Sequence, residues 1–551
     1  MMAAELRPDQ TARPDLPIVS VPNDATVVDP MTTLEVNFTE QQLANALAAL
    51  SAPMNELTSS SREARRGIAF LAYPGAVRDG RDFIGDAVLR GAAAVLYEAK
   101  GFAWNPDWKV PHLGVPDLKV NASRIAGHVY GHPTQALWMT GVTGTNGKTS
   151  VSQWIAKAME LAGRKSAVIG TIGNGLVGSL QASDNTTPDA VALQRMLRDY
   201  VRAGATACAM EVSSHGLDQG RVAYIKYDVA VFTNLTRDHL DYHGTMDRYG
   251  EAKAQLFDFR GVTHAVINVD DGFGAMLAAR VANRPGVKVI RYSMRQNGNV
   301  ANLAAKSVAV SPSGVAFDVA GEFGTAHVES DILGAFNVGN LLAVIGALIA
   351  SGMTLAQAAD IAGNLPPVPG RMQTVRAGGK NSGKAGAGEK PLVVVDYAHT
   401  PDALEKALST VSAIVPENGR LISVFGCGGD RDRGKRPLMG AISARYADVT
   451  IITSDNPRTE DPQRIIADIE AGIDVGLKAG VKTGKGAAHY RAIVDRQQGI
   501  YEALNEARPG DIVFIAGKGH EDYQIIGETR HHFSDVEVAQ EALSAWRGGR
   551  P

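Results

Sequence analysis

The chain of 551 residues has only two cysteines, Cys208 and Cys427, far apart in apolar or glycine-rich stretches. This excludes a disulfide framework and offers no zinc-site spacing. The longest apolar run, Leu341–Ala350, has about half the residues that a bilayer-spanning helix needs. The first residues are acidic and proline-rich, without the basic start and apolar core of a signal peptide. We therefore expect a cytoplasmic protein that has no membrane span.

A strong charge of one sign is also missing. The formal net charge is -3 at pH 7, which gives no overall bias towards nucleic acid or membranes. Charged residues make up 21% and hydrophobic residues 45%, which is typical of a globular protein. Because the chain is too long for a single core, it predicts about three domains.

The stretch GVTGTNGKTS, Gly141–Ser150, predicts a phosphate-binding loop. It lies between an apolar run ending at Thr140, which indicates a strand, and a segment with helical periodicity. Glycines turn backbone N–H groups inward, Lys148 can reach the outer phosphates, and the Thr149 hydroxyl can ligate Mg²⁺. The usual pattern has a glycine where Val142 stands, so a tight turn with a chance Gly-Lys-Thr is the alternative.

Two later apolar runs also end in polar groups. ATACAME ends at the carboxylate of Glu211, and DVAVFTN ends at Asn234, followed by Asp238 and His239. In an open parallel sheet the carboxyl ends of the strands share one edge, so these groups should converge on the phosphate loop and hold Mg²⁺. Helix caps or loop polar groups are the alternative interpretation.

The pattern of apolar runs and helical periods predicts an α/β fold in three domains after a loose leader of residues 1–35. We expect a small N-terminal α/β domain over residues 36–136 and a central doubly wound sheet with the phosphate loop over residues 137–368. A C-terminal Rossmann-like sheet should follow over residues 369–551. A glycine- and lysine-rich stretch, residues 377–390, predicts a flexible surface insert.

Four runs in the C-terminal part read as buried parallel strands with charged tips. Tips of both charge signs suit a zwitterionic small molecule. The residues at these strand tips are Asp396, His399, Arg431, Arg433, Asp455, Asn456, Arg458, Lys518, His520 and Glu521. In the first domain the hydroxyls and arginine of Ser59–Arg62 suit a phosphate or sugar, although a solvated loop is the simpler interpretation.

Together these motifs resemble the Mur ligase family over nearly the whole chain beyond the leader, in the family's three-domain order. Several are specific to members that add the third residue of the peptidoglycan stem peptide. The motifs are GVTGTNGKTS, DNTTPD, EVSSHGLDQGR, FTNLTRDHLDYHG, YGEAKAQLF, GAFNVGN, PGRMQ, YAHTPDAL, GCGGDRDRGKRPLM, DNPR and GKGHE.

The resemblance implies that ATP, with Mg²⁺, phosphorylates the γ-carboxylate of UDP-N-acetylmuramoyl-L-alanyl-D-glutamate and that an amino group then displaces phosphate. It assigns catalysis to Lys148, Glu211, His239 and Lys253. It assigns the metal to Thr149, Glu211, His239 and a carbamylated Lys253. Without the resemblance, Lys253 would be read as an ordinary lysine on a helix surface.

The resemblance also assigns the two nucleotide sites. ATP would contact Gly144, Thr145, Asn146, Gly147, Lys148, Thr149, Ser150, Asn340, Arg371, Asp396 and His399. The UDP precursor would contact Ser61, Thr186, Thr187, Ser213, Gln219 and Arg221. A helix cap at the start of NVGNLLAVIGAL is the alternative for Asn337 and Asn340.

For the incoming amino acid, the resemblance gives a pocket of six residues. A guanidinium at Arg458 would bind a second carboxylate through two hydrogen bonds, which predicts meso-diaminopimelate. The alternative amino acid is L-lysine. The alternative proteins are a ligase of the folate or cyanophycin type and a nucleotide switch or motor. We expect a monomer. The pocket residues are Arg431, Asp455, Asn456, Arg458, Gly517 and Glu521.

Overall fold

The computed structural model describes residues 32–75, 78–183, 185–295, 301–376, 390–478 and 489–548. Residue contacts divide the chain into two compact units, one ending at Val129 and one beginning at Tyr130. No helix within the described ranges is long and apolar enough to cross a membrane. The expected leader falls almost wholly outside these ranges, as does the glycine- and lysine-rich insert apart from Lys390.

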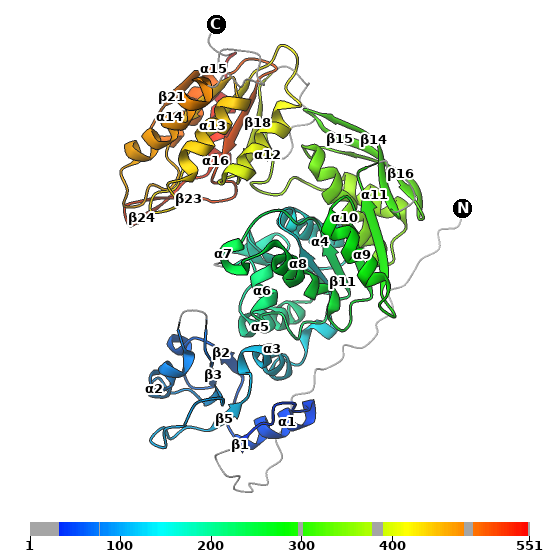
Figure 1. Ribbon diagram of the computed structural model, residues 1–551, viewed down its shortest axis with the longest axis vertical. Helices are drawn as coiled ribbons and strands as arrows, with labels where there is room; N and C mark the ends of the chain where they lie inside the picture. The colour runs from blue at the N-terminus through cyan, green and yellow to red at the C-terminus, as the bar shows by residue number, and fades with distance from the viewer. Residues whose placement is uncertain are drawn as a thin grey trace, which may run out of the picture. The chain divides into compact units, whose positions relative to one another are not determined.

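The first unit is built on a five-stranded parallel sheet in the order β1-β5-β4-β3-β2 (Figure 1). Its middle strands are short apolar runs, and β3 and β4 are buried along their whole length. The elements are β1 Thr32–Thr33, α1 Glu40–Ala49, β2 Glu56–Thr58, η1 Ser61–Glu63, β3 Ile68–Ala72, η2 Gly80–Phe83, α2 Ile84–Leu89, β4 Ala94–Glu98, β5 His112–Val115 and α3 Leu118–Val129.

The second unit begins with a sheet of eleven strands in the order β16-β15-β14-β13-β12-β11-β6-β10-β7-β8-β9. Strands β10 and β11 flank β6 in parallel, so their carboxyl ends meet at one edge. The strands are β6 Trp138–Thr143, β7 Ser166–Gly170, β8 Gly173–Leu176, β9 Ser179–Gln181, β10 Ala207–Glu211, β11 Val229–Phe232, β12 His264–Asn268, β13 Lys288–Ser293, β14 Leu303–Ser311, β15 Gly314–Gly321 and β16 Gly324–Ser330.

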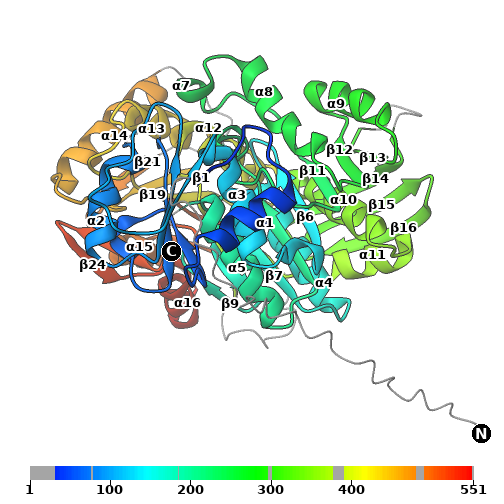
Figure 2. The same cartoon turned by 90° about the horizontal axis from the view of Figure 1, so that it is seen from below.

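Helices cover both faces of the central part of this sheet. Apolar residues of α4 and α10 pack on one face, and those of α5 and α9 pack on the other. At one edge α11 lies beside β16 (Figure 2). The helices are η3 Pro133–Gln135, α4 Lys148–Leu161, α5 Ala190–Arg202, α6 Ser214–Asp218, α7 Leu240–His243, α8 Met246–Ala254, η4 Gln255–Asp258, α9 Gly272–Ala282, α10 Ala335–Ala350 and α11 Leu355–Gly363.

A six-stranded sheet in the order β17-β18-β22-β19-β20-β21 follows, parallel except for β17 at the edge. Helices α12, α13 and α14 pack on one face, and α15 and α16 pack on the other. The elements are β17 Gln373–Val375, β18 Leu392–Asp396, α12 Pro401–Ser412, β19 Leu421–Phe425, α13 Lys435–Tyr446, β20 Val449–Ile452, α14 Pro462–Lys478, β21 His489–Ala492, α15 Arg496–Glu506, β22 Ile512–Ala516, β23 Tyr523–Ile526, β24 Thr529–His532 and α16 Asp535–Ala545.

The predicted α/β class with several largely parallel sheets is confirmed. Two local predictions need correction. Strand β6 does not end at Thr140 but continues to Thr143, and helix α4 already begins at Lys148. The first part of GVTGTNGKTS therefore belongs to the strand, which leaves only a short turn between strand and helix.

Candidate active site

The phosphate loop joins β6 to α4 at the centre of the large sheet. Gly147 caps α4 with φ 88°, a left-handed conformation that glycine adopts without strain. The Lys148 ammonium donates hydrogen bonds to the carbonyls of Gly144 and Thr145, at 2.9 and 3.0 Å. Strand, loop and helix thus have the arrangement that phosphate binding requires, and the alternative of an isolated tight turn is not supported.

The loop is braced by the residues that follow β11. The Asn146 N–H donates to Asn234 Oδ1 at 2.9 Å, and the Thr145 N–H donates to the Asn234 carbonyl at 2.8 Å. Thr233 Oγ1 donates to the Asn146 carbonyl at 2.6 Å. The predicted meeting of neighbouring strand ends is confirmed here, with Thr233 and Asn234 as supports that the residue assignment had left out.

The alternative interpretation of Asn337 and Asn340 as helix caps is wrong. Helix α10 is capped by Gly334, and the two asparagines lie inside its first turns. Asn340 Nδ2 donates to Asn337 Oδ1 at 2.8 Å. A Cβ atom at Gly147 would stand 2.6 Å from Asn340 Oδ1, so Asn340 packs directly against the phosphate loop.

Glu211, at the end of β10, meets the start of α4 through a hydrogen bond. The Thr149 hydroxyl donates to Glu211 Oε2 at 3.0 Å, and the Thr171 N–H donates to Oε1 at 2.7 Å. Both Thr149 and Glu211 are buried. A carboxylate and a hydroxyl beside a phosphate loop are hard oxygen ligands of the kind that Mg²⁺ uses.

Lys253 is not a surface lysine, because it is only 1% exposed. From α8 its ammonium donates to the Gly144 carbonyl at 2.9 Å and lies 4.4 Å from the ring centroid of Tyr249. Burial, followed by the charge of Lys148, holds the pKa of Lys253 well below its usual value. The interpretation of Lys253 as an ordinary helix-surface residue is therefore wrong.

His239 belongs to a group of aromatic rings beside Lys253. Its ring centroid is 5.9 Å from that of Tyr249 and 4.9 Å from that of His215. Burial lowers the pKa of His239, which favours the neutral imidazole that binds metals. His239 has φ 52°, and a strained backbone of this kind is common at functional sites.

The five precursor-binding candidates of the second unit lie together. Thr187 Oγ1 donates to Ser213 Oγ at 3.1 Å, and Arg221 Nη1 donates to the Thr187 carbonyl at 2.7 Å. Arg221 Nη2 also donates to Gln219 Oε1 at 2.6 Å. The hydroxyls of Thr186 and Thr171 are 3.1 Å apart, and Thr171 binds Glu211, so this group adjoins the proposed metal ligands.

Arg371, Asp396 and His399 are grouped around Tyr397. The Arg371 guanidinium lies 4.6 Å from the Tyr397 ring centroid, and the His399 ring lies 4.7 Å from it. Asp396 accepts hydrogen bonds from the N–H groups of Met372 and Ala398, each at 2.8 Å. Burial raises the pKa of Asp396 and lowers that of His399.

The candidate amino-acid pocket is assembled at the carboxyl ends of β20 and β22. Lys518, with no exposed side-chain surface, lies 3.3 Å from Asp455 Oδ1 and 3.8 Å from Glu521 Oε2. It also donates to Asn456 Oδ1 at 3.1 Å, and Asn456 Nδ2 donates to Glu521 Oε2 at 3.1 Å. Lys518 was named among the strand tips but not among the pocket residues, and its burial only becomes evident in the fold.

Arg458, two residues after Asn456, lines a hollow of about 840 Å³ with Glu460, Gln498 and Gln524. Its Nη1 donates to the Gly429 carbonyl at 2.9 Å. The other predicted pocket residues do not line this hollow: Arg431, Asp455, Asn456, Gly517 and Glu521. Arg458 therefore borders this hollow, whereas the Lys518 cluster does not.

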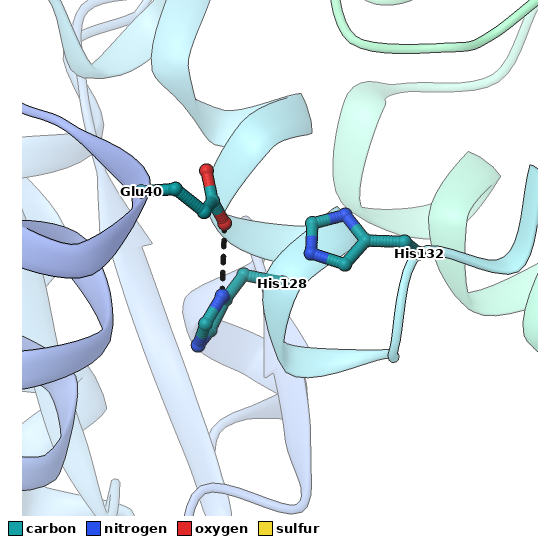
Figure 3. Close-up of side chains that lie close together, drawn as sticks. All are labelled: Glu40, His128 and His132. Carbon is teal, nitrogen blue, oxygen red and sulfur yellow. Dashed lines mark hydrogen bonds and ion pairs between the residues drawn. The ribbon is translucent and has the colours of Figure 1, made fainter. Parts of the chain in front are cut away.

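In the first unit the structure shows Ser61 at the start of η1, buried, with a hydrogen bond that lowers the pKa of Asp86. Another polar contact of this unit joins α1 to α3. His128 Nδ1 lies 2.9 Å from Glu40 Oε1 (Figure 3). We assign this hydrogen bond a structural role, because it joins two helices to each other.

A phosphate loop with adjoining oxygen ligands, followed by a second sheet with charged strand tips, defines a nucleotide-dependent enzyme that handles small charged substrates. Residues 142–348 match the family described as the Mur ligase middle domain, and residues 370–519 match the Mur ligase glutamate ligase domain. The chain belongs to the Mur ligase family and is an ATP-dependent ligase that forms a carbon–nitrogen bond. The alternative of a nucleotide switch or motor is therefore not supported.

Curated relatives match almost the whole chain. A UDP-N-acetylmuramoyl-L-alanyl-D-glutamate--2,6-diaminopimelate ligase of Chromobacterium violaceum is 50% identical over 92% of this chain and 97% of its own length. A protein of the same name from Neisseria meningitidis serogroup A is 46% identical, covering 90% of this chain and 96% of its own.

Solved structures share the fold. A structure bearing the same ligase name has 40% identity and a TM-score of 0.65, covering 90% of this chain and 95% of that one. The MurF ligase of Thermotoga maritima, solved in complex with ADP, has 18% identity and a TM-score of 0.57, covering 89% and 97%. At that identity the second likeness shows the fold alone.

Proposed function

We propose that this protein adds meso-2,6-diaminopimelate to UDP-N-acetylmuramoyl-L-alanyl-D-glutamate, converting ATP to ADP and phosphate. The relatives named for this reaction support it, because they match nine-tenths of the chain. The observation that carries the choice of amino acid is the loop Asp455–Arg458: the Arg458 guanidinium acts electrostatically on the Glu521 carboxyl, which with Asp455 lies beside the buried Lys518. We expect the reaction to take place in the cytoplasm as a step of peptidoglycan precursor synthesis.

The proposed chemistry begins with a carboxylate that amines do not attack at a useful rate, because its oxide is a poor leaving group. Transfer of the γ-phosphoryl group of ATP to the γ-carboxylate of the D-glutamyl end gives an acyl phosphate and ADP. The incoming amine adds to the carbonyl carbon, and the tetrahedral intermediate then expels phosphate. In this scheme Lys148 holds the outer phosphates, and the group of Thr186, Thr187, Ser213, Gln219 and Arg221 holds the glutamyl substrate.

The donor set fits Mg²⁺, because the Thr149 hydroxyl and the Glu211 carboxylate lie 3.0 Å apart beside the phosphate loop. The ion, when bound, neutralises charge on the transferring phosphoryl group. A carbamate on Lys253 also fits, since the lowered pKa favours the neutral amine that reacts with CO₂. His239 would complete the metal ligands.

Selection between diaminopimelate and L-lysine would rest on Arg458. Its guanidinium can bind the distal carboxylate of diaminopimelate through two parallel hydrogen bonds. L-Lysine would bring an ammonium to the same place, and two like charges about 4 Å apart repel by roughly 4 kcal/mol at an effective dielectric constant near 20. Asp455 and Glu521 offer carboxylates for the ammonium groups of the substrate.

The test is phosphate release from ATP with the UDP-linked dipeptide and each amino acid in turn. We expect diaminopimelate to support turnover and L-lysine to support little. Faster turnover with L-lysine would overturn the assignment of the amino acid. Turnover with another acceptor, such as a folate, and none with the UDP-linked dipeptide would overturn the whole proposal.

A further inference from the structure

Two loops of the C-terminal sheet carry the arginines of the proposed amino-acid pocket. Arg431 lies in the loop after β19, and Arg458 lies in the loop after β20. The loops are joined along their backbones, because the Gly429 N–H donates to the Asn456 carbonyl at 2.9 Å. A Cβ atom at Gly429 would overlap the Pro457 carbonyl oxygen. The position of one loop therefore fixes that of the other.

A buried ion pair lies directly under this junction. Glu460, two residues after Arg458, receives two parallel hydrogen bonds from Arg436 of α13, at 2.7 and 2.9 Å. The Arg436 side chain has no exposed surface and that of Glu460 is 8% exposed. Paired bonds of this kind fix orientation as well as distance.

The same carboxylate also binds the first loop. The Asp430 N–H donates to Glu460 Oε2 at 3.2 Å, next to Arg431 in the chain. A second connection between the two loops lies on the surface, where the Thr459 hydroxyl and the Thr459 N–H both donate to Asp430 Oδ2, at 2.9 and 3.1 Å. Glu460 thus connects three segments: α13, the loop of Arg431 and the loop of Arg458.

The backbone of Arg458 needs such support. Its φ of 52° lies in the left-handed region, which is costly for a residue with a side chain and persists only where the surroundings hold it. Hydrogen bonds from the Arg458 N–H to the Ile525 carbonyl and from the Gly527 N–H to the Arg458 carbonyl hold it from the other side. Arg458 is therefore held between the β23–β24 hairpin and the loop that Glu460 anchors.

We infer that the Glu460–Arg436 pair is a positioning device for amino-acid selection: it holds both arginine-bearing loops so that the Arg458 guanidinium meets the distal carboxylate of the incoming amino acid. This inference rests on the proposed function. Neither Glu460 nor Arg436 needs to touch the substrate, since each acts through Arg458.

The experiment compares three variants of the full-length enzyme. Glu460→Gln keeps the shape of the side chain but weakens the bonds to Arg436. Thr459→Val removes the exposed hydroxyl bond to Asp430 and leaves the bond from the Thr459 N–H in place. Asp511→Asn is the matched control, because Asp511 is a buried carboxylate bound to Arg420 at 2.7 Å and precedes β22, at the opposite end of the sheet.

For Glu460→Gln we expect the KM for diaminopimelate to rise about tenfold, since a displacement of about 1 Å in a positioned group has effects of this order or larger. The KM values for ATP and the UDP precursor should stay within about twofold, and the preference for diaminopimelate over L-lysine should fall. Thr459→Val should shift the diaminopimelate KM in the same direction by about two- to threefold. Asp511→Asn should lower thermal stability without this selective shift.

Equal rises in all three KM values, or the same diaminopimelate shift in Asp511→Asn, would overturn the inference. If the wild type is active and Glu460→Gln has an unchanged KM for diaminopimelate, the inference is also overturned, but the proposed function is not affected. If Glu460→Gln does not fold, an unchanged KM in Thr459→Val counts against the inference. A wild-type enzyme that never uses diaminopimelate would overturn the proposed function itself, and the inference with it.

Discussion

The ammonium groups of Lys148 and Lys253 donate hydrogen bonds to the same acceptor, the carbonyl oxygen of Gly144, each at 2.9 Å. Two cations on one buried acceptor repel each other, and burial disfavours both charges. The pKa of Lys148 is lowered mainly by burial, and that of Lys253 falls well below its usual value through burial and the Lys148 charge. The arrangement favours Lys253 as a neutral amine, which is the form that reacts with CO₂.

The first prediction is that activity depends on CO₂. In buffer stripped of CO₂ and bicarbonate we expect phosphate release to fall, and added bicarbonate should restore it. Lys253→Gln should lose activity by about a hundredfold or more, because one oxygen ligand near the transferred phosphoryl group is missing. The variant should not respond to bicarbonate.

The control for this prediction is Lys165→Gln, since Lys165 precedes β7 and donates to the Ala203 carbonyl away from the phosphate loop. It should keep wild-type activity and the wild-type response to bicarbonate. Full activity of the wild-type enzyme without CO₂, together with an intact-mass spectrum that shows no adduct, would refute the carbamate.

The second prediction concerns Mg²⁺. Glu211→Gln keeps a side chain of the same shape but replaces a charged oxygen by an amide. We expect the Mg²⁺ concentration for half-maximal phosphate release to rise by about tenfold or more, because neutral oxygens bind hard cations more weakly. The measurement is a magnesium titration at saturating substrates. Glu160→Gln, at the far end of α4, should leave the titration unchanged, and an unchanged midpoint in Glu211→Gln would remove Glu211 from the metal site.

The arrangement around the phosphate loop was largely predictable from sequence, for a physical reason. Apolar runs that end in glycine or a carboxylate indicate parallel strands with a ligand edge, and strands β6, β10 and β11 are neighbours in the sheet. That placed Glu211 beside Thr149 and Asn234 beside Asn146. The antiparallel extension β14–β16 at the edge was not predicted, since the alternation of strands and helices was expected to continue.

Burial was the property that sequence could not supply. Lys253 and Lys518 have polar neighbours in the sequence, yet both are buried and donate hydrogen bonds to residues far away in the chain, Gly144 and Asn456. Asn340 has the residue type of a helix cap, but its contact partner is a loop 193 residues earlier, which no local pattern encodes. The Glu460–Arg436 pair likewise depends on the packing of α13 against the loop after β20.

The third prediction tests Arg458. Arg458→Ala should raise the KM for diaminopimelate by about a hundredfold, since a charge-assisted paired contact contributes about 2–3 kcal/mol, while the KM for ATP stays nearly constant. The KM of Arg458→Lys for diaminopimelate should lie between those of the wild type and Arg458→Ala, because an ammonium keeps the charge but not the paired geometry. Steady-state kinetics with each substrate varied in turn gives the answer. Similar rises for ATP and diaminopimelate would point to a folding defect and count against selection by Arg458.

The last prediction concerns acid. Hydrogen bonding from Arg436 lowers the pKa of Glu460 from 4.5 to about 2. Because the folded-state pKa is depressed, the carboxylate stabilises the folded protein fully above pH 4.5, and this contribution is lost as the pH falls through about 2. Glu460→Gln lacks it at every pH. The difference in thermal midpoint between wild type and variant should therefore be largest above pH 4.5 and shrink on acidification. A difference that stays constant across this range would show that the ionised pair does not stabilise the domain.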